Sequence, residues 1–118
     1  MNFEFSDEQQ LLREQAQSFL EDNCSIKKVR ETFESDSPYN LELWKKVVEL
    51  GWTAASIPEK YQGLGLSYLN LCVIAEELGR ALAPIPFSSS VYLAAESLSL
   101  YGTEEQKSSF LPRLASGE

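Results

Sequence analysis

The side chains in this sequence that could act as acids, bases or nucleophiles are mainly carboxylates. The 118 residues include 18 aspartates and glutamates, two cysteines and no histidine. Histidine is the commonest general base and metal ligand, so histidine-dependent triads and metal sites are excluded within this chain. Cys24 and Cys72 have no metal-ligand spacing, and we expect both to remain reduced. The sequence therefore predicts no metal-binding residue.

Glu76 and Glu77 are the carboxylates most suggestive of a catalytic role, because they lie in the most apolar predicted helix, at about residues 67–82. A catalytic base needs a suitable pKa and a position close to the proton that it removes. However, Asn70 and Arg80 share a polar arc of about 120° with these glutamates. This arrangement favours contact with solvent or a salt link between domains, so we predict no catalytic residue.

Gly63 and Gly65, in the segment from Trp52 to Leu66, form the only glycine pattern that suggests a phosphate cradle. A dinucleotide-binding motif would need a third glycine and an apolar strand leading into the turn. Both are missing, and glycines also serve tight turns by permitting positive φ. We therefore predict a tight turn and no cofactor-binding residue.

Bulk properties exclude several functional classes. The net charge of −8 disfavours nucleic acid as a partner. No apolar run approaches the roughly 20 residues that span a bilayer, so we expect no membrane interaction. Residues 1–5 have neither the basic region nor the apolar core of a secretory signal. We therefore expect a cytoplasmic protein.

The elements that must position these groups carry repeated helix signals and hardly any strand signals. Residues 6–9 and 103–106 read as capping boxes, with a hydroxyl residue followed three positions later by glutamine. Asn40 and Ser67 are further N-cap candidates. Gly51 suits the residue after a helix C-terminus. These signals predict an all-α fold.

The apolar periodicity places the helices between these caps. We predict an orthogonal bundle of about six helices, at residues 7–21, 26–34, 41–50, 67–82, 88–100 and from 104 to about 110. Residues 83–86, Ala-Pro-Ile-Pro, should form a rigid extended break, and Pro112 should kink or interrupt the last helix. The length suits one domain, residues 1–118.

Several sequence blocks resemble the acyl-CoA dehydrogenase family. Residues 51–67, GWTAASIPEKYQGLGLS, are similar to the family pattern LGW…IPEEYGGLGLS, and residues 76–80 are similar to EELGR. Residues 102–107, GTEEQK, and 111–118, LPRLASGE, resemble the family's GTEEQK…LPxLASGE, and FSDEQ at residues 5–9 matches as well. The blocks occur in the family's order and spacing and cover essentially the whole chain.

The resemblance implies a six-helix N-terminal domain. In the family a middle β-domain and a C-terminal helical bundle follow it, and both are absent from this chain. FAD is held mainly by those later domains and a neighbouring subunit, and the catalytic glutamate lies in the bundle of most members. We therefore expect an inactive, FAD-free isolated chain that is an excised domain, a natural fragment or a subunit that needs a partner.

For the full-length enzyme, the resemblance implies α,β-dehydrogenation of acyl-CoA thioesters with electron-transfer flavoprotein as partner. In this family the N-terminal helices line the distal end of the acyl cavity. The matching residues here, Phe87, Ser88, Ser90 and Val91, are our candidates for substrate binding. Alternatively, Ser88 serves only as an N-cap, and Phe87 and Val91 belong to the core.

Two residues depart from simple expectations. Gln62 stands where the family often has glycine, which is tolerable if its φ stays negative. Gly79 lies within a predicted helix, which suggests either a close helix crossing or a bend into the segment that follows.

The sequence is also compatible with other functions and with self-association. A related acyl-CoA oxidase or flavin monooxygenase would share these features, and a non-catalytic helical interaction module would share the helices. Apolar residues on most sides of the fourth predicted helix lead us to expect a homo-oligomer.

Overall fold

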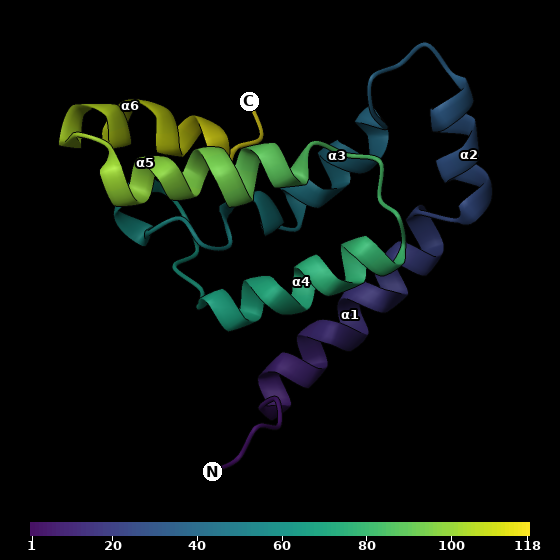
Figure 1. Cartoon of the computed structure of the whole chain (residues 1–118), viewed down its shortest axis with the longest axis horizontal. Coiled ribbons are helices and arrows are strands. Elements are labelled where there is room, and N and C mark those ends of the chain that lie inside the picture. The colour runs from purple at the N-terminus through teal and green to yellow at the C-terminus, as the bar shows by residue number, and fades with distance from the viewer.

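The computed structural model describes all of residues 1–118 and contains helices and their connections, without strands (Figure 1). This confirms the predicted all-α fold. In chain order the elements are α1 (Asp7–Asn23), α2 (Ile26–Glu34), α3 (Leu41–Glu49), η1 (Trp52–Ala54), η2 (Glu59–Tyr61), α4 (Tyr68–Arg80), η3 (Ser88–Ala95), α5 (Glu96–Tyr101) and α6 (Glu104–Ala115). The short elements η1 and η2 are 3-10 helices, whereas η3 is a π-helix that continues directly into α5.

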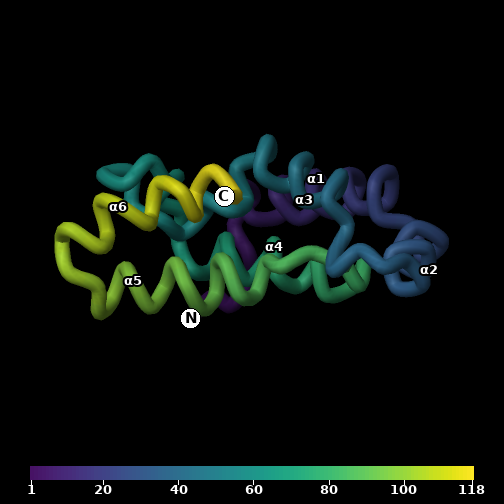
Figure 2. The backbone as a smooth tube through the Cα atoms, turned by 90° about the horizontal axis from the view of Figure 1, so that it is seen from above, coloured from purple at the N-terminus to yellow at the C-terminus, as the bar shows by residue number.

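The domain is a flat plate rather than a sphere. Its extents are 43 × 43 × 20 Å, and the short dimension equals about two helix diameters. Seen edge-on, η3 with α5 and the returning helix α6 lie side by side at one end, and α2 lies at the other (Figure 2). Helices α1 and α4 pair below them in the view of Figure 1. A plate of this thickness leaves much of its helical surface uncovered.

The helix starts follow the predicted caps. Ser6 Oγ accepts a hydrogen bond from the Gln9 amide, and the Gln9 side chain accepts one from the Ser6 amide. Thr103 and Gln106 repeat this capping box at α6. Each box satisfies backbone donors that a helix N-terminus leaves without intrahelical partners. The side chains of Asn40 and Ser67 cap α3 and α4 in the predicted way.

Two hydrophobic clusters hold the plate together. The larger cluster joins α1, α2, α3 and α4 to the start of η3, and Phe19 packs edge-on against Trp52 with ring centroids 5.4 Å apart. The smaller cluster lies between η1, η2, the end of η3 and α6, and is built around Ile57 and Leu111. Both of these residues are fully buried. Helix α6 is therefore anchored both to the turn that follows α3 and to the helix formed by η3 and α5.

The segment after α3 folds into a turn held by its own backbone. The amides of Leu64, Gly65 and Leu66 donate to carbonyls of residues 54, 57 and 55 at 2.8–2.9 Å. A Cβ at Gly63 would lie 1.9 Å from the carbonyl oxygen of Ile57, so only glycine fits this approach. Gly51, at φ +81°, ends α3 as predicted.

Two expectations about backbone conformation need correction, and at Gly79 one of two alternatives is favoured. Gln62 has φ +67°, not a negative value, because it ends η2 in the left-handed region. Helix α6 continues through Pro112 to Ala115, since buried Leu111 and Ala115 fix the helix on both sides of the proline. An added Cβ at Gly79 would meet nothing within 4 Å, so this glycine does not serve a close helix crossing. Its position one residue before the end of α4 suits the alternative of a bend.

The contrast between two glycines gives a stability test. Gly79→Ala should raise the free energy of unfolding by about 0.5–1 kcal/mol, because alanine is the better helix former and the site is open. Gly63→Ala should lower it by about 3 kcal/mol, because the methyl group collides with a backbone carbonyl. Urea unfolding followed by circular dichroism measures both. Equal effects of the two substitutions would contradict the turn geometry.

Candidate functional site

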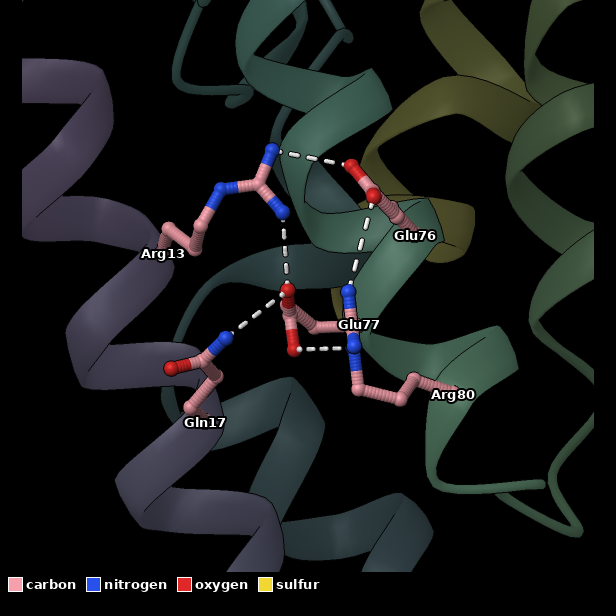
Figure 3. A network of polar contacts seen from close by, with 5 residues as sticks. All are labelled: Arg13, Gln17, Glu76, Glu77 and Arg80. Atoms are coloured by element: carbon pink, nitrogen blue, oxygen red, sulfur yellow. Dashed lines mark hydrogen bonds and ion pairs between the residues drawn. The ribbon is translucent and has the colours of Figure 1, made fainter.

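The carboxylate of Glu77 lies at the centre of a polar network between α1 and α4 (Figure 3). Its side chain is 2% exposed. Arg13 Nη1 donates to Oε1 at 2.9 Å, and Gln17 Nε2 donates to the same oxygen at 3.2 Å. Arg80 Nε lies 3.4 Å from Oε2. Both carboxylate oxygens therefore have partners within the chain, which gives Glu77 a role in joining two helices.

The neighbouring carboxylate, Glu76, lies on the exposed side of the same network. Arg13 Nη2 donates to it at 2.8 Å, and Arg80 Nη2 lies 3.6 Å away. The hydrogen bond from Arg13, followed by the charge of that guanidinium, lowers the pKa of Glu76. Of the two alternatives, solvent contact or a salt link between domains, Glu76 shows the first in part, and its salt links are formed inside this domain. The sequence did not reveal the link to Arg13 because Arg13 is more than 60 residues away.

The four candidate substrate-binding residues lie at the start of η3 but in different surroundings. Phe87 and Val91 are 3% and 1% exposed and belong to the larger hydrophobic cluster. Ser88 is exposed and Ser90 is half-buried. Ser88 is not an N-cap, because Phe87 before it is already helical and η3 begins without a side-chain cap.

A groove between the C-terminal half of α4 and the start of η3 contains two of these candidates. Its volume is about 350 Å³, and seven of its nine lining residues are hydrophobic. The lining residues are Ala75, Leu78, Gly79, Leu82, Ala83 and Ile85 from α4 and the connection, and Phe87, Ser88 and Tyr92 from the following helix. Ser90 and Val91 do not border it. This volume lies at the small end of the range for ligand pockets.

The sequence analysis missed most of this groove. Ala75 and Gly79 are four positions apart, which places them on one face of α4, and Leu82 follows just beyond the end of that helix. This spacing could have been used to predict which α4 residues line the groove. Tyr92 could not have been found in this way, because its direction depends on the π-helix.

The remaining hollows and turns offer little chemistry. A cavity of about 550 Å³ between α1 and α4 is lined by both polar and apolar residues, including Gln17, Glu21 and Arg80. The amides of Gly63 and Gly65 donate to carbonyls of Pro58 and Ile57, so they are not free to bind a phosphate. No three histidine, cysteine or acidic residues gather as metal ligands. None of the helices has the length and apolar character needed to cross a bilayer.

The fold and the groove define an all-helical domain with an apolar recess between α4 and η3. The sequence profile of the acyl-CoA dehydrogenase N-terminal domain matches residues 6–118. The chain therefore belongs to the acyl-CoA dehydrogenase family, of which it represents the N-terminal helical domain.

Individual relatives agree with this assignment. Mitochondrial isovaleryl-CoA dehydrogenase of Arabidopsis thaliana is 34% identical over 116 residues, which are 97% of this chain and 28% of the relative. The ChsE4-ChsE5 complex from Mycobacterium tuberculosis has a chain with a TM-score of 0.89 and 27% identity, covering 99% of this chain and 32% of that one. An acyl-CoA dehydrogenase complexed with FAD, from Bacillus anthracis, gives a TM-score of 0.83 and 31% identity, covering 97% and 20%. The chain thus spans less than a third of the length of these relatives.

The buried network gives a second stability test. Glu77→Gln should lower the free energy of unfolding by about 3 kcal/mol, because it removes a buried charge that Arg13 and Arg80 both face. Glu76→Gln is the matched control on the same helix. Its effect should be much smaller, since the Glu76 side chain is 53% exposed. Chemical denaturation measures both, and a larger loss from Glu76→Gln would show that the buried pair does not join the helices.

Acid should destabilise the domain through three exposed ion pairs. In each, a hydrogen bond from a basic side chain is the main cause that lowers the glutamate pKa; the pairs are Glu42 with Lys46, Glu76 with Arg13 and Glu104 with Lys60. A lowered folded-state pKa stabilises the fold above the unfolded value of about 4.3, and this stabilisation disappears as pH falls through the folded value.

The midpoint temperature of thermal unfolding should therefore fall as pH decreases from about 5 to 3. The triple substitution of these glutamates by glutamine should flatten that dependence. Thermal unfolding at a series of pH values measures the effect. A midpoint that rises over this interval would contradict the stabilising role of the pairs.

Proposed function

We propose that this chain is the N-terminal domain of an FAD-dependent enzyme that oxidises acyl-CoA thioesters to α,β-unsaturated products. The observation that carries the proposal is the family match over residues 6–118. The named activity of the Arabidopsis relative, isovaleryl-CoA dehydrogenase, supports the substrate class. The FAD in the Bacillus anthracis structure supports the cofactor. The reaction itself needs groups from the parts of the enzyme that this chain does not cover.

The role we propose for the chain is to line the distal end of the acyl cavity. The groove between α4 and η3 supports this role because it is apolar and two candidate residues, Phe87 and Ser88, border it. An alkyl chain would gain about 25 cal/mol for each Å² of apolar surface that leaves water there. Ser90 and Val91 do not line the groove, and their proposed role is to fix the position of η3, whose residues do.

We propose that FAD is bound by the full-length enzyme and that this chain alone binds none. The glycine turn supports the second point, because its amides already donate to backbone carbonyls. Bound FAD would supply the two-electron oxidant for this dehydrogenation. The contribution of this chain to that step is to position the acyl group and to exclude water from it.

The proposed partners are the acyl-CoA substrate, an electron-transfer flavoprotein and further copies of the same enzyme. The thin plate and its exposed apolar residues support association, since Tyr68, Leu69 and Leu93 are all at least 48% exposed. The cytoplasmic location and the absence of nucleic acid partners stay predictions from the sequence.

Expression of the full-length enzyme beside the 118-residue chain tests the function. The full-length protein should purify yellow and reduce an electron acceptor when an acyl-CoA is added. The isolated chain should be colourless because the amides of its glycine turn are already paired, and inactive because the reaction needs groups that lie outside it. Absorbance spectra and an acceptor-reduction assay measure both properties.

The outcomes separate the alternatives. Hydrogen peroxide formation without an added acceptor would indicate an oxidase. A flavin-free full-length protein would favour an interaction module. Stoichiometric flavin on the isolated chain would contradict the proposed division of roles.

A further inference from the structure

The three residues that follow α6 are held by a complete set of local hydrogen bonds. The Gly117 amide donates to the Leu114 carbonyl at 3.0 Å, and the Glu118 amide donates to the Arg113 carbonyl at 3.0 Å. This pair of bonds, with a left-handed glycine between them, is a common way to end a helix. Arg113 Nη2 also lies 3.0 Å from the Glu118 carboxylate. The backbone direction after α6 is therefore fixed locally.

Two distant side chains tie the same segment to the core of the domain. Trp44 of α3, which is 7% exposed, donates from Nε1 to the Gly117 carbonyl at 3.1 Å, across 73 positions of sequence. Thr53 of η1, which is 1% exposed, donates from Oγ1 to the Ala115 carbonyl at 2.8 Å. The last residues of most domains are poorly ordered unless they are tied down in this way. The segment is thus fixed relative to α3 and η1 as well as to its own helix.

Gly117 passes so close to α3 that no side chain fits between them. Its φ is +77°, and a Cβ at this position would lie 2.3 Å from Cγ2 of Val48. Valine is stiff about χ1, so this methyl group cannot simply rotate away. Any larger residue at position 117 would push the segment away from α3 and from the Trp44 indole. The close approach and the hydrogen bond therefore depend on each other.

We infer that Trp44 and Gly117 form a latch that fixes the direction in which the chain leaves this domain, and so positions the domain against the flavin-binding part of the enzyme. The local bonds after α6 already end the helix, and the bond from α3 adds a fixed orientation relative to the core. Trp44 is thus a positioning residue that acts through Gly117. The inference rests on the proposed function, because it assumes that the flavin-binding part follows α6.

Hydrogen exchange in the 118-residue chain tests the latch itself. Trp44→Phe removes the indole N–H and keeps an aromatic ring in the core. The Gly117 and Glu118 amides should then exchange about tenfold faster, because one hydrogen bond no longer holds the segment closed. Trp52→Phe is the matched control, since Trp52 is equally buried, at 6%, and packs against Phe19 of α1. It should leave the exchange of these two amides unchanged.

Flavin reduction in the full-length enzyme tests the positioning role. The measurement is the rate at which saturating acyl-CoA bleaches the flavin absorbance without oxygen, so that no electron acceptor is needed. Trp44→Phe should lower this rate by about tenfold, since misplacement of reacting groups by about 1 Å can cost about 100-fold. Trp52→Phe should leave the rate near the wild-type value. Thermal unfolding compares the stability that each tryptophan variant loses.

Gly117→Ala provides a second variant that opens the latch from the other side, and it decides the question if Trp44→Phe does not fold. The added methyl group collides with Val48, so exchange of the Glu118 amide should rise and flavin reduction should slow. Adding Val48→Ala removes the colliding Cγ2 atom. The double variant should therefore recover part of both losses, which a general weakening of the core would not do.

The outcomes separate the inference from the proposed function. If Trp44→Phe and Trp52→Phe behave alike in both measurements, Trp44 only fills the core and the inference is overturned. Faster exchange with unchanged flavin reduction would also overturn it, because the latch would then position nothing. A wild-type enzyme whose flavin no acyl-CoA bleaches would overturn the proposed function, while the exchange measurement would still show whether the latch exists.

Discussion

The pairing of α1 with α4 through Glu77 is the constraint on which the rest of the domain depends. A carboxylate that is 2% exposed must have charged partners, because an isolated buried charge is very unfavourable. Arg13 from α1 and Arg80 from α4 itself supply them. These contacts join α1 and α4 in the observed register. Once α4 is fixed against α1, its opposite side is left to meet η3.

That register decides where the groove lies. Glu77 faces α1. Ala75 and Gly79, each two positions from Glu77, therefore lie on the opposite face of α4 and border η3. The left-handed residue Leu82 then ends the helix and starts the extended connection to η3. The same helix therefore supplies a polar joint on one side and an apolar wall on the other.

The flat shape explains how such a domain can serve a larger enzyme. With a thickness of about two helices, the two hydrophobic clusters bury their own residues but cannot cover both faces of every helix. Exposed apolar residues along α4 and α5 are the result. Surfaces of this kind suit contact with other domains or subunits of the family's enzymes.

Local signals in the sequence determined the helices and their starts. Caps such as Ser6 and Thr103 act over three or four residues, so the predicted helix 26–34 agrees with α2, and both capping boxes formed. The family blocks determined the fold for the same reason, since they are contiguous runs. The spacing of Ala75 and Gly79, which places both on one face of α4, was also available in the sequence.

Tertiary packing alone decided the features that depend on distant residues. Arg13 reaches Glu77 across 64 positions, which no local pattern can indicate. Burial of Leu111 and Ala115 kept α6 helical through Pro112, although proline usually ends or kinks a helix. The π-turn likewise has no local signal in the three serines where it begins. Local propensities amount to about 1 kcal/mol per residue, whereas burying one large side chain contributes about 2–3 kcal/mol, so packing decides wherever the two conflict.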